Sequence, residues 1–340
     1  MPARKLTVAA AALSAAALLA ACQSNPAEDS GNGGDVYMGN ATAAASPASS
    51  RPAGTVHPFD AVRDLDATGD LIAVRSGGEL TVGTLEEITS GRGRKHTLDD
   101  ACGDVTANNG TFVAACGNDI KLITSDGEQT VHSDSPVTAA ALTASGEIVA
   151  GSHDDKTIRV FRDGKQTGDF DAARETDRIL TAPRGGNRDD AVVRLNNFDT
   201  TIQDLDWKDG RQGGTLRAGL GVGGVAAGPH GLILAADATG GQLLVYNTDD
   251  IIRLQMSAPV GQSPWAVAWD NPKMLAWASS TATNTAEGYS LSTGVPVLKE
   301  NFATVANAQS MVSLPDGTLL LASASGEGLQ VVTPGDTTTS

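Results

Sequence analysis

Residues 147–161 read EIVAGSHDDKTIRVF, and this stretch decides the fold of the chain. An apolar run at 147–151 is followed by a polar loop and then by a second run with alternating polarity at 157–161. Asp163-Gly164 comes next, and Asp-Gly is a strong signal for a two-residue hairpin. The stretch therefore predicts short antiparallel strands that are joined by alternately long and short connections.

The same plan recurs seven times, with copies about 41 residues apart on average, and a period of about 40–45 residues indicates a β-propeller. The first apolar runs are LIAV from Leu71, TFVAA from Thr111, EIVAG from Glu147, AVVRL from Ala191, LILAA from Leu232, MLAWA from Met274 and LLLAS from Leu319. The second runs are ELTVG from Glu79, IKLI from Ile120, TIRVF from Thr157, TIQDL from Thr201, LLVY from Leu243, GYSL from Gly288 and LQVV from Leu329. We therefore expect an all-β fold over residues 53–336, a seven-bladed propeller with four antiparallel strands in each blade. No helical periodicity extends far enough to predict a helix in this region.

The last unit lacks an outer strand, since only three strand-like runs precede the C-terminal residues. Residues 54–59, GTVHPF, come before the inner strand of the first unit. We expect this N-terminal strand to complete the last blade, which closes the ring and removes an exposed edge. Pro58 is compatible with an outermost strand, because one side of such a strand needs no hydrogen-bond partner.

The N-terminus predicts export. Arg4 and Lys5 precede an apolar stretch at 6–21, which is too short to span a bilayer and has the layout of a signal peptide. The stretch ends with LAAC at 19–22, which resembles the bacterial lipobox. The resemblance implies cleavage after residue 21 and acylation of Cys22, with palmitate-type chains that hold the protein on the extracytoplasmic face of the cell membrane. The alternative is an ordinary secreted protein with a chance cysteine.

Residues 22–52 follow as a predicted tether. They are mostly Ser, Ala, Asn, Gly and Pro, with almost nothing to bury, so we expect this segment to be disordered. From residue 22 onward, 22 Lys and Arg stand against 40 Asp and Glu, a net charge of −18. Phosphate backbones repel such a surface, which argues against nucleic-acid binding. A high net charge favours a soluble monomer, and the alternative is a dedicated site for cationic partners.

Cys102 and Cys116 predict a disulfide. They lie symmetrically about a turn at residues 108–110, and such residues face each other across an antiparallel hairpin. The facing distance is close to what a disulfide requires, and an exported location permits oxidation. The alternative is a pair of buried thiols; the spacing is not that of a CxxC redox motif.

Several units resemble known propeller repeats. Residues 261–268, GQSPWAVA, resemble the YVTN type of bacterial repeat, and 314–319, LPDGTL, contain the turn that such repeats share with NHL and WD-type blades. Residues 152–161 are similar to a WD blade, although Phe161-Arg162 stands where such blades close with Trp-Asp. The likeness, together with LAAC, implies a bacterial envelope lipoprotein with a propeller. It implies architecture only, because propellers host unrelated functions.

The candidate binding residues lie on one face of the predicted ring. Connections between the second and third strands, and between blades, all fall on the same face, which we call the long-loop face. The candidates there are Arg75, His153, Asp154, Asp155, Asn196, Asn197, Asp199, Trp265, Asn307 and Gln309. The His and carboxylates could ligate a metal, as in the lactonase-type propellers that the fold resembles, or they could be solvated residues that cap turns.

The sequence favours a binding protein over an enzyme. It contains no HExxH, Gly-x-Ser-x-Gly or phosphate-loop motif, so we expect no catalytic residue, metal or cofactor. We therefore predict a membrane-anchored, non-catalytic scaffold lipoprotein of the cell envelope, which recognises a protein, peptide or glycan through the long-loop face. The alternative is a metal-dependent hydrolase or lactonase with a pocket at the mouth of the funnel.

Overall fold

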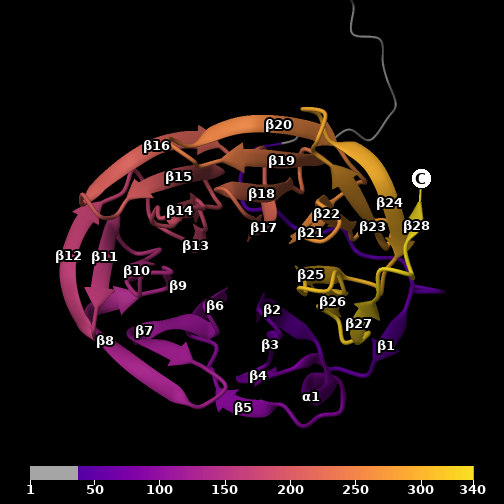
Figure 1. Ribbon diagram of the computed structural model, residues 1–340, viewed down its shortest axis with the longest axis horizontal. Helices are drawn as coiled ribbons and strands as arrows, with labels where there is room; N and C mark the ends of the chain where they lie inside the picture. Colours follow the sequence, from indigo (N-terminus) through magenta and orange to yellow (C-terminus); the bar gives the residue numbers. More distant parts are fainter. Residues whose placement is uncertain (1–36, 340) are drawn as a thin grey trace, which may run out of the picture. The chain divides into compact units, whose positions relative to one another are not determined.

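The chain forms the expected ring of seven antiparallel sheets around a central channel (Figure 1). The structure is a computed structural model, which describes residues 37–339. The signal peptide, Cys22 and residues 23–36 lie outside the described residues. Within the described part, no helix is long and apolar enough to cross a membrane.

In blades 1 to 6 the strands follow chain order from the channel outward, and in blade 7 the outermost strand is β1. Blade 1 contains β2 (Val62–Thr68), β3 (Leu71–Ser76), β4 (Glu79–Gly83) and β5 (Arg94–Thr97). Blade 2 contains β6 (Cys102–Asn108), β7 (Thr111–Ile123) and β8 (Glu128–Val137). Blade 3 contains β9 (Ala139–Leu142), β10 (Ile148–Gly151), β11 (Thr157–Arg162) and β12 (Lys165–Asp171). Blade 4 contains β13 (Arg178–Ala182), β14 (Ala191–Asn196), β15 (Thr201–Asp206) and β16 (Arg211–Arg217).

The remaining blades complete the ring. Blade 5 contains β17 (Val222–Ala227), β18 (Leu232–Asp237), β19 (Gln242–Asn247) and β20 (Arg253–Pro259). Blade 6 contains β21 (Pro264–Asp270), β22 (Leu275–Ser280), β23 (Thr285–Ser290), β24 (Val297–Ala303) and β28 (Thr338–Thr339). Blade 7 contains β25 (Ala308–Ser313), β26 (Leu319–Ser323), β27 (Leu329–Val332) and β1 (Thr55–His57).

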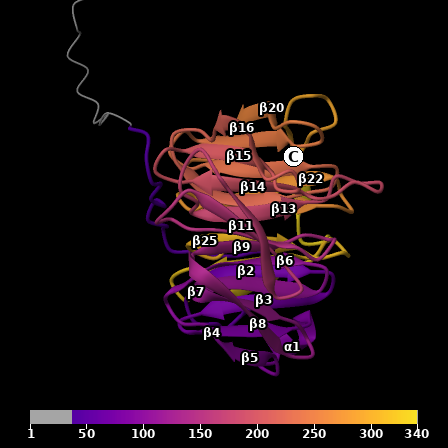
Figure 2. The same cartoon turned by 90° about the vertical axis from the view of Figure 1, so that its left-hand side faces the viewer.

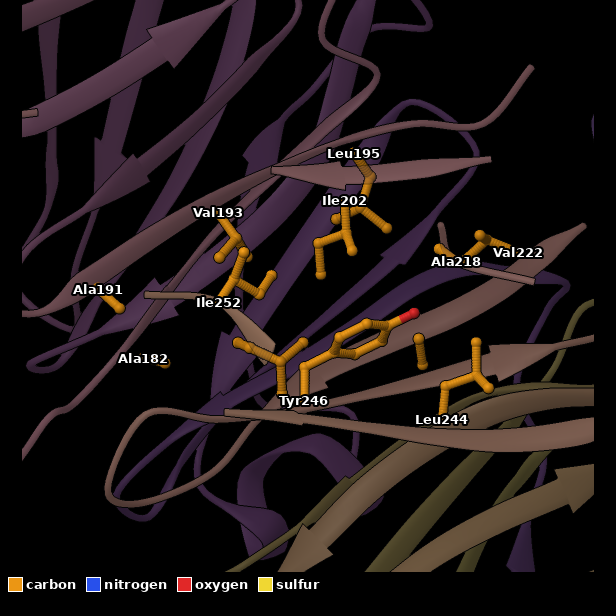
Figure 3. Close-up of a cluster of buried hydrophobic side chains, with 12 residues drawn as sticks. Ala182, Ala191, Val193, Leu195, Ile202, Ala218, Val222, Leu244, Tyr246 and Ile252 are labelled. Carbon is orange, nitrogen blue, oxygen red and sulfur yellow. The ribbon is translucent and has the colours of Figure 1, made fainter. Parts of the chain in front are cut away.

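Each pair of neighbouring blades shares its own hydrophobic core. Successive side chains of a strand point to opposite faces of the sheet. In β14, Val193 therefore packs in a cluster shared with blade 5, whereas Val192 packs in a cluster shared with blade 3. Figure 3 shows the cluster between blades 4 and 5, where the ring of Tyr246 lies among aliphatic side chains. Another cluster joins blade 7 to blade 1, so the apolar packing is continuous around the described ring.

The predicted ring closure is confirmed. β1 pairs with β27 in antiparallel register, with Thr55 opposite Val331 and His57 opposite Leu329. The fully buried amide of Gln330 adds a second tie, because its Nε2 donates to the carbonyl oxygens of Ala53 and Ala303, each at 2.9 Å. The first and last parts of the propeller are therefore held together in one blade.

Two blades differ from the simple four-strand plan. In blade 2, β7 spans both middle strands that the sequence predicts, and its first half pairs with β6 while its second half pairs with β8. Gly117, which has a φ of +66°, lies between the two halves. In blade 6, β28 pairs with the outer strand β24 and adds a fifth strand, with Thr339 opposite Glu300.

One short helix corrects the expectation of no helix. α1 (Leu85–Thr89) lies between β4 and β5. Thr84 and Glu87 form a capping box, in which the Thr84 amide donates to Glu87 Oε2 at 2.8 Å. The Thr-x-x-Glu signature is present in the sequence, but five residues are too few for a helical period to be detected.

The described part of the predicted tether makes defined contacts with the ring. Residues 37–52, which we call the strap, contain no helix or strand but lie along one side of the ring (Figure 2). The Gly39 amide donates to the Leu220 carbonyl at 3.0 Å, and Ser49 Oγ donates to the Thr304 carbonyl at 2.5 Å. Composition predicts disorder because the strap has little to bury, but it does not reveal that loops of the ring offer polar partners. Residues 22–36 lie outside the described residues.

Candidate functional site

The seven inner strands enclose a channel with a cavity of about 650 Å³. This volume lies within the range of about 300–1,000 Å³ that is usual for ligand pockets. The lining comes from β2, β6, β9, β13, β17, β21 and β25. Most lining positions carry small or aliphatic side chains, so the charged residues of the channel stand out.

Glycines allow the inner strands of blades 5 and 6 to approach each other closely. A Cβ atom on Gly224 of β17 would lie 2.6 Å from the carbonyl oxygen of Trp265 of β21, and one on Gly223 would lie 3.1 Å from it. Both distances are too short for a comfortable contact. Gly223 and Gly224 therefore allow close packing at the channel wall.

Three carboxylates meet in the channel. Asp64 and Asp66 lie two residues apart on β2, and Asp104 lies on the neighbouring strand β6. Asp64 Oδ2 accepts a hydrogen bond from the Val105 amide at 2.6 Å, which links blades 1 and 2. The opposing charge is Arg178 of β13, whose Nε lies 3.3 Å from Asp104 Oδ2 and whose guanidinium also donates to the Gly223 carbonyl.

The crowding of these carboxylates changes their acidity. Burial, and then the charge of Asp104, raise the pKa of Asp64 to about 7, although the Val105 amide, Arg178 and Arg75 oppose the rise. Burial raises the pKa of Asp66 well above its ordinary value, and the charges of Asp64 and Asp104 add to the effect. The Asp64–Asp66 pair therefore retains a proton near neutral pH.

Replacing Asp64 with Asn should make the protein more stable at pH 8. A carboxyl whose pKa is raised on folding binds more protons in the folded than in the unfolded chain, so the free energy of unfolding falls as pH rises from about 4 to about 7. A full shift from 3.8 to about 7 corresponds to about 4 kcal/mol. Water in the open channel screens part of the repulsion, so we expect a gain of about 1–2 kcal/mol.

Chemical denaturation at pH 5 and pH 8 measures this gain. The Asn side chain can still accept from the Val105 amide, so the substitution removes charge without removing that hydrogen bond. The matched control is Asp134→Asn, which changes an exposed carboxylate of blade 2. Equal pH dependence for the wild type and Asp64→Asn would show that Asp64 does not titrate in this range.

The sequence analysis gives Arg75 as a candidate binding residue. In the structure, its guanidinium is engaged by backbone carbonyl oxygens. Its side chain is fully buried, and it donates to the carbonyl oxygens of Gly103, Asp99 and Cys102 at 2.7, 2.8 and 3.1 Å. These bonds tie β3 of blade 1 to the start of blade 2. A sequence pattern places Arg75 at the end of a strand but does not show whether its guanidinium is already engaged.

The predicted loop residues of blade 3 pair with one another or with near neighbours. His153 Nε2 lies 3.4 Å from Asp154 Oδ1, and both side chains are exposed. Asp155 Oδ2 lies 2.8 Å from Arg159 Nη2. These residues are not part of the channel lining.

The predicted loop residues of blade 4 behave in the same way. Asn196 Oδ1 accepts from the Asp199 amide at 2.8 Å, and Asp199 Oδ2 lies 2.5 Å from Arg174 Nε. The backbone amide of Asn197 donates to Asp177 Oδ2 at 2.6 Å. Such contacts are typical of polar residues that cap turns.

The other three candidates lie at the channel wall or beside the strap. Trp265 and Gln309 line the channel at the starts of β21 and β25. Asn307 lies just before β25, and its backbone amide donates to Ser46 Oγ of the strap at 2.8 Å. The structure therefore brings two of the ten predicted binding residues to the channel wall.

The sequence analysis missed the channel carboxylates and Arg178. A signal was available, because Asp64 and Asp66 alternate with apolar residues in the inner strand VRDLDAT, whereas the inner strand of blade 3 reads AAAL. Paired acidic residues in such a strand mark a polar channel wall.

The predicted disulfide between Cys102 and Cys116 is confirmed. The two residues face each other across β6 and β7, as their symmetry about the turn indicates. Asp104 follows Cys102 by two residues, so the bond fixes the start of the strand that carries this channel carboxylate.

The described residues show no metal centre. Between residues 37 and 339, no three His, Cys, Asp or Glu side chains gather in a way that could hold a metal ion. His153 and Asp199, which the metal hypothesis invoked, have the local partners described above.

Comparison with known proteins shows the fold alone. No protein-family model matches the chain, and a search of curated proteins finds no significant match. A chain of the mitotic checkpoint complex is 14% identical, with a TM-score of 0.64, over 97% of this chain and 98% of that one. A streptogramin B lyase is 12% identical (TM-score 0.62; 85% and 97% covered), and the WD40 β-propeller domain of Doa1 is 15% identical (TM-score 0.58; 83% and 95% covered).

Proposed function

We propose that this protein is a membrane-anchored binding propeller of the cell envelope, which recognises a protein or peptide segment with a cationic group at the central channel. The observation that carries the proposal is the meeting of Asp64, Asp66 and Asp104 in a cavity of about 650 Å³. A similar fold occurs in a chain of a multiprotein complex, which is consistent with a binding or scaffold role. The anchor is inferred from the sequence around Cys22.

Electrostatics favours a cationic ligand. Two channel-lining residues carry positive charge, Arg178 and Arg63, and each already has an acidic partner, Asp104 and Asp100, at 3.3 Å. The net charge of the whole chain is −16, which increases the local concentration of cations around the protein. Trp265 also lines the channel, and Trp is the side chain that best supports cation–π contacts.

The protonated carboxyl pair makes recognition dependent on pH. A positive charge placed beside Asp64 and Asp66 favours their ionised forms and lowers their pKa values, so binding releases a proton. Binding should therefore strengthen as pH rises through about 7, the pKa of Asp64 in the free protein. No observation on the described residues favours the hydrolase or lactonase alternative, so it is not proposed.

Binding of a fluorescein-labelled tetralysine peptide to the full chain in detergent micelles tests the proposal by fluorescence anisotropy. We expect binding that is stronger at pH 8 than at pH 6, and about tenfold weaker in Asp66→Asn and in Asp104→Asn, since each loses a charge-assisted contact. The control Asp134→Asn should bind like the wild type.

Tetraglutamate is the matched control peptide. Equal binding of tetraglutamate, or equal weakening in Asp134→Asn, would mean that the channel carboxylates do not recognise the ligand. Loss of binding in the two channel variants alone would support the channel as the site.

A further inference from the structure

The strap lies against loops of the long-loop face, and we call the loop surface that it covers the groove. It crosses from the connection before β17 of blade 5 to the connection before β25 of blade 7. Its hydrogen-bond partners on the ring include Thr200, Leu220, Ser263, Thr281, Asn284, Thr304 and Asn307. All of these belong to connections between strands or between blades, and none is charged.

The ring recognises both donors and acceptors of the strap. Ser46 Oγ donates to the Thr281 carbonyl at 2.6 Å and accepts from the Asn307 amide at 2.8 Å. The carbonyl of Pro47 accepts from Asn284 Nδ2 at 2.7 Å. These are the contacts of an extended peptide that is read through its backbone and its hydroxyl groups.

The groove also retains unused bonding capacity. Asn284 is only 6% exposed, yet its Oδ1 is a buried oxygen with no hydrogen-bond partner. An unsatisfied buried oxygen is costly, so a ligand with a donor at this place would bind better than the strap does. This amide oxygen points to a ligand other than the strap itself.

The strap has no fully buried residue. Every residue from 37 to 52 is at least partly exposed, so none contributes a buried apolar anchor. A segment with so few anchors stays bound because it is joined to β1, which keeps its effective concentration high. A partner segment with an additional donor could therefore displace it.

We propose that this groove over blades 5 to 7 is a second binding site, which takes an extended, uncharged peptide rich in small and hydroxyl side chains from a partner protein. The strap occupies the site within the same molecule and leaves when the partner binds. Residues 41–50 of the strap, ATAAASPASS, illustrate the ligand chemistry, since they are uncharged and small. The site is separate from the channel carboxylates and does not depend on them.

A labelled peptide with the sequence of residues 37–52 is the probe, and the full chain in detergent micelles is the protein. Ser46→Ala/Ser49→Ala removes the hydroxyl hydrogen bonds of Ser46 and Ser49 and should loosen the strap. We expect this double variant to bind the peptide about tenfold more tightly than the wild type, because the competing strap is weaker. The control Ser50→Ala changes an exposed hydroxyl of the strap and should bind like the wild type.

A peptide in which the same two serines are alanine tests whether the groove reads hydroxyl groups. It should bind the loosened chain about tenfold less tightly than the native peptide. Hydrogen exchange at the Asn307 amide gives a second readout: protection should fall in the double variant and return when the native peptide is added. Equal peptide affinity for the wild type and the double variant, or an Asn307 amide that the peptide does not protect, would overturn the proposal.

Discussion

Deletion of residues 53–59 is expected to lower the melting temperature by about 6–12 °C, a loss of about 3 kcal/mol. The deletion removes β1, so the backbone of β27 loses its partner strand and becomes an exposed edge. It also removes Val56 and Phe59, which pack against the clusters on either side of blade 7. Differential scanning calorimetry of the full chain and the deletion measures the change.

A deletion of the same length in the strap, residues 42–48, is the matched control. These residues are all partly exposed, so the control should melt within about 2 °C of the wild type. Gln330→Leu probes the closure without changing chain length. It should cost about 2–3 kcal/mol because the Val305 amide and the Ala53 carbonyl lose the Gln330 side chain as a partner, and the Ala303 carbonyl loses one of its two donors. Equal melting temperatures for the two deletions would show that β1 does not stabilise the ring.

Replacement of Cys22 with Ala is expected to reduce the membrane-bound fraction of the processed protein by about tenfold or more. Two acyl chains provide stable anchoring, and without the cysteine sulfur no lipid can be attached. The protein should then appear in the medium or remain as an uncut precursor. Fractionation with immunoblotting measures the distribution, and mass spectrometry of the N-terminal peptide identifies the acyl groups.

Ser24→Ala is the matched control for anchoring, because it changes a neighbouring small residue and leaves LAAC intact. It should remain in the membrane fraction and carry the same acyl groups as the wild type. Retention of cleaved Cys22→Ala protein on the membrane at the wild-type level would contradict lipidation and leave an ordinary secreted protein as the better hypothesis.

The number of blades, the ring closure and the disulfide could all be predicted from local patterns. Each blade is specified by alternation within short strands and by turn residues such as Asp163-Gly164, both of which have positive φ values. Cys102 and Cys116 face each other because both lie at the same distance from one turn. These features depend on residues that are close in sequence or equivalent in successive repeats. They can therefore be predicted without knowing how the blades pack together.

The candidate sites depended instead on how separate blades are brought together. Asp66, Asp104 and Arg178 belong to three inner strands, and the strap meets loops more than 160 residues away, such as the connection at Leu220. The repeat pattern predicts that a ring forms, but it does not predict which side chains face the same part of the channel, or which loop groups remain free to bind a passing segment. Local alternation and turn chemistry are encoded residue by residue, whereas convergence across the channel arises only when seven packed interfaces close the circle.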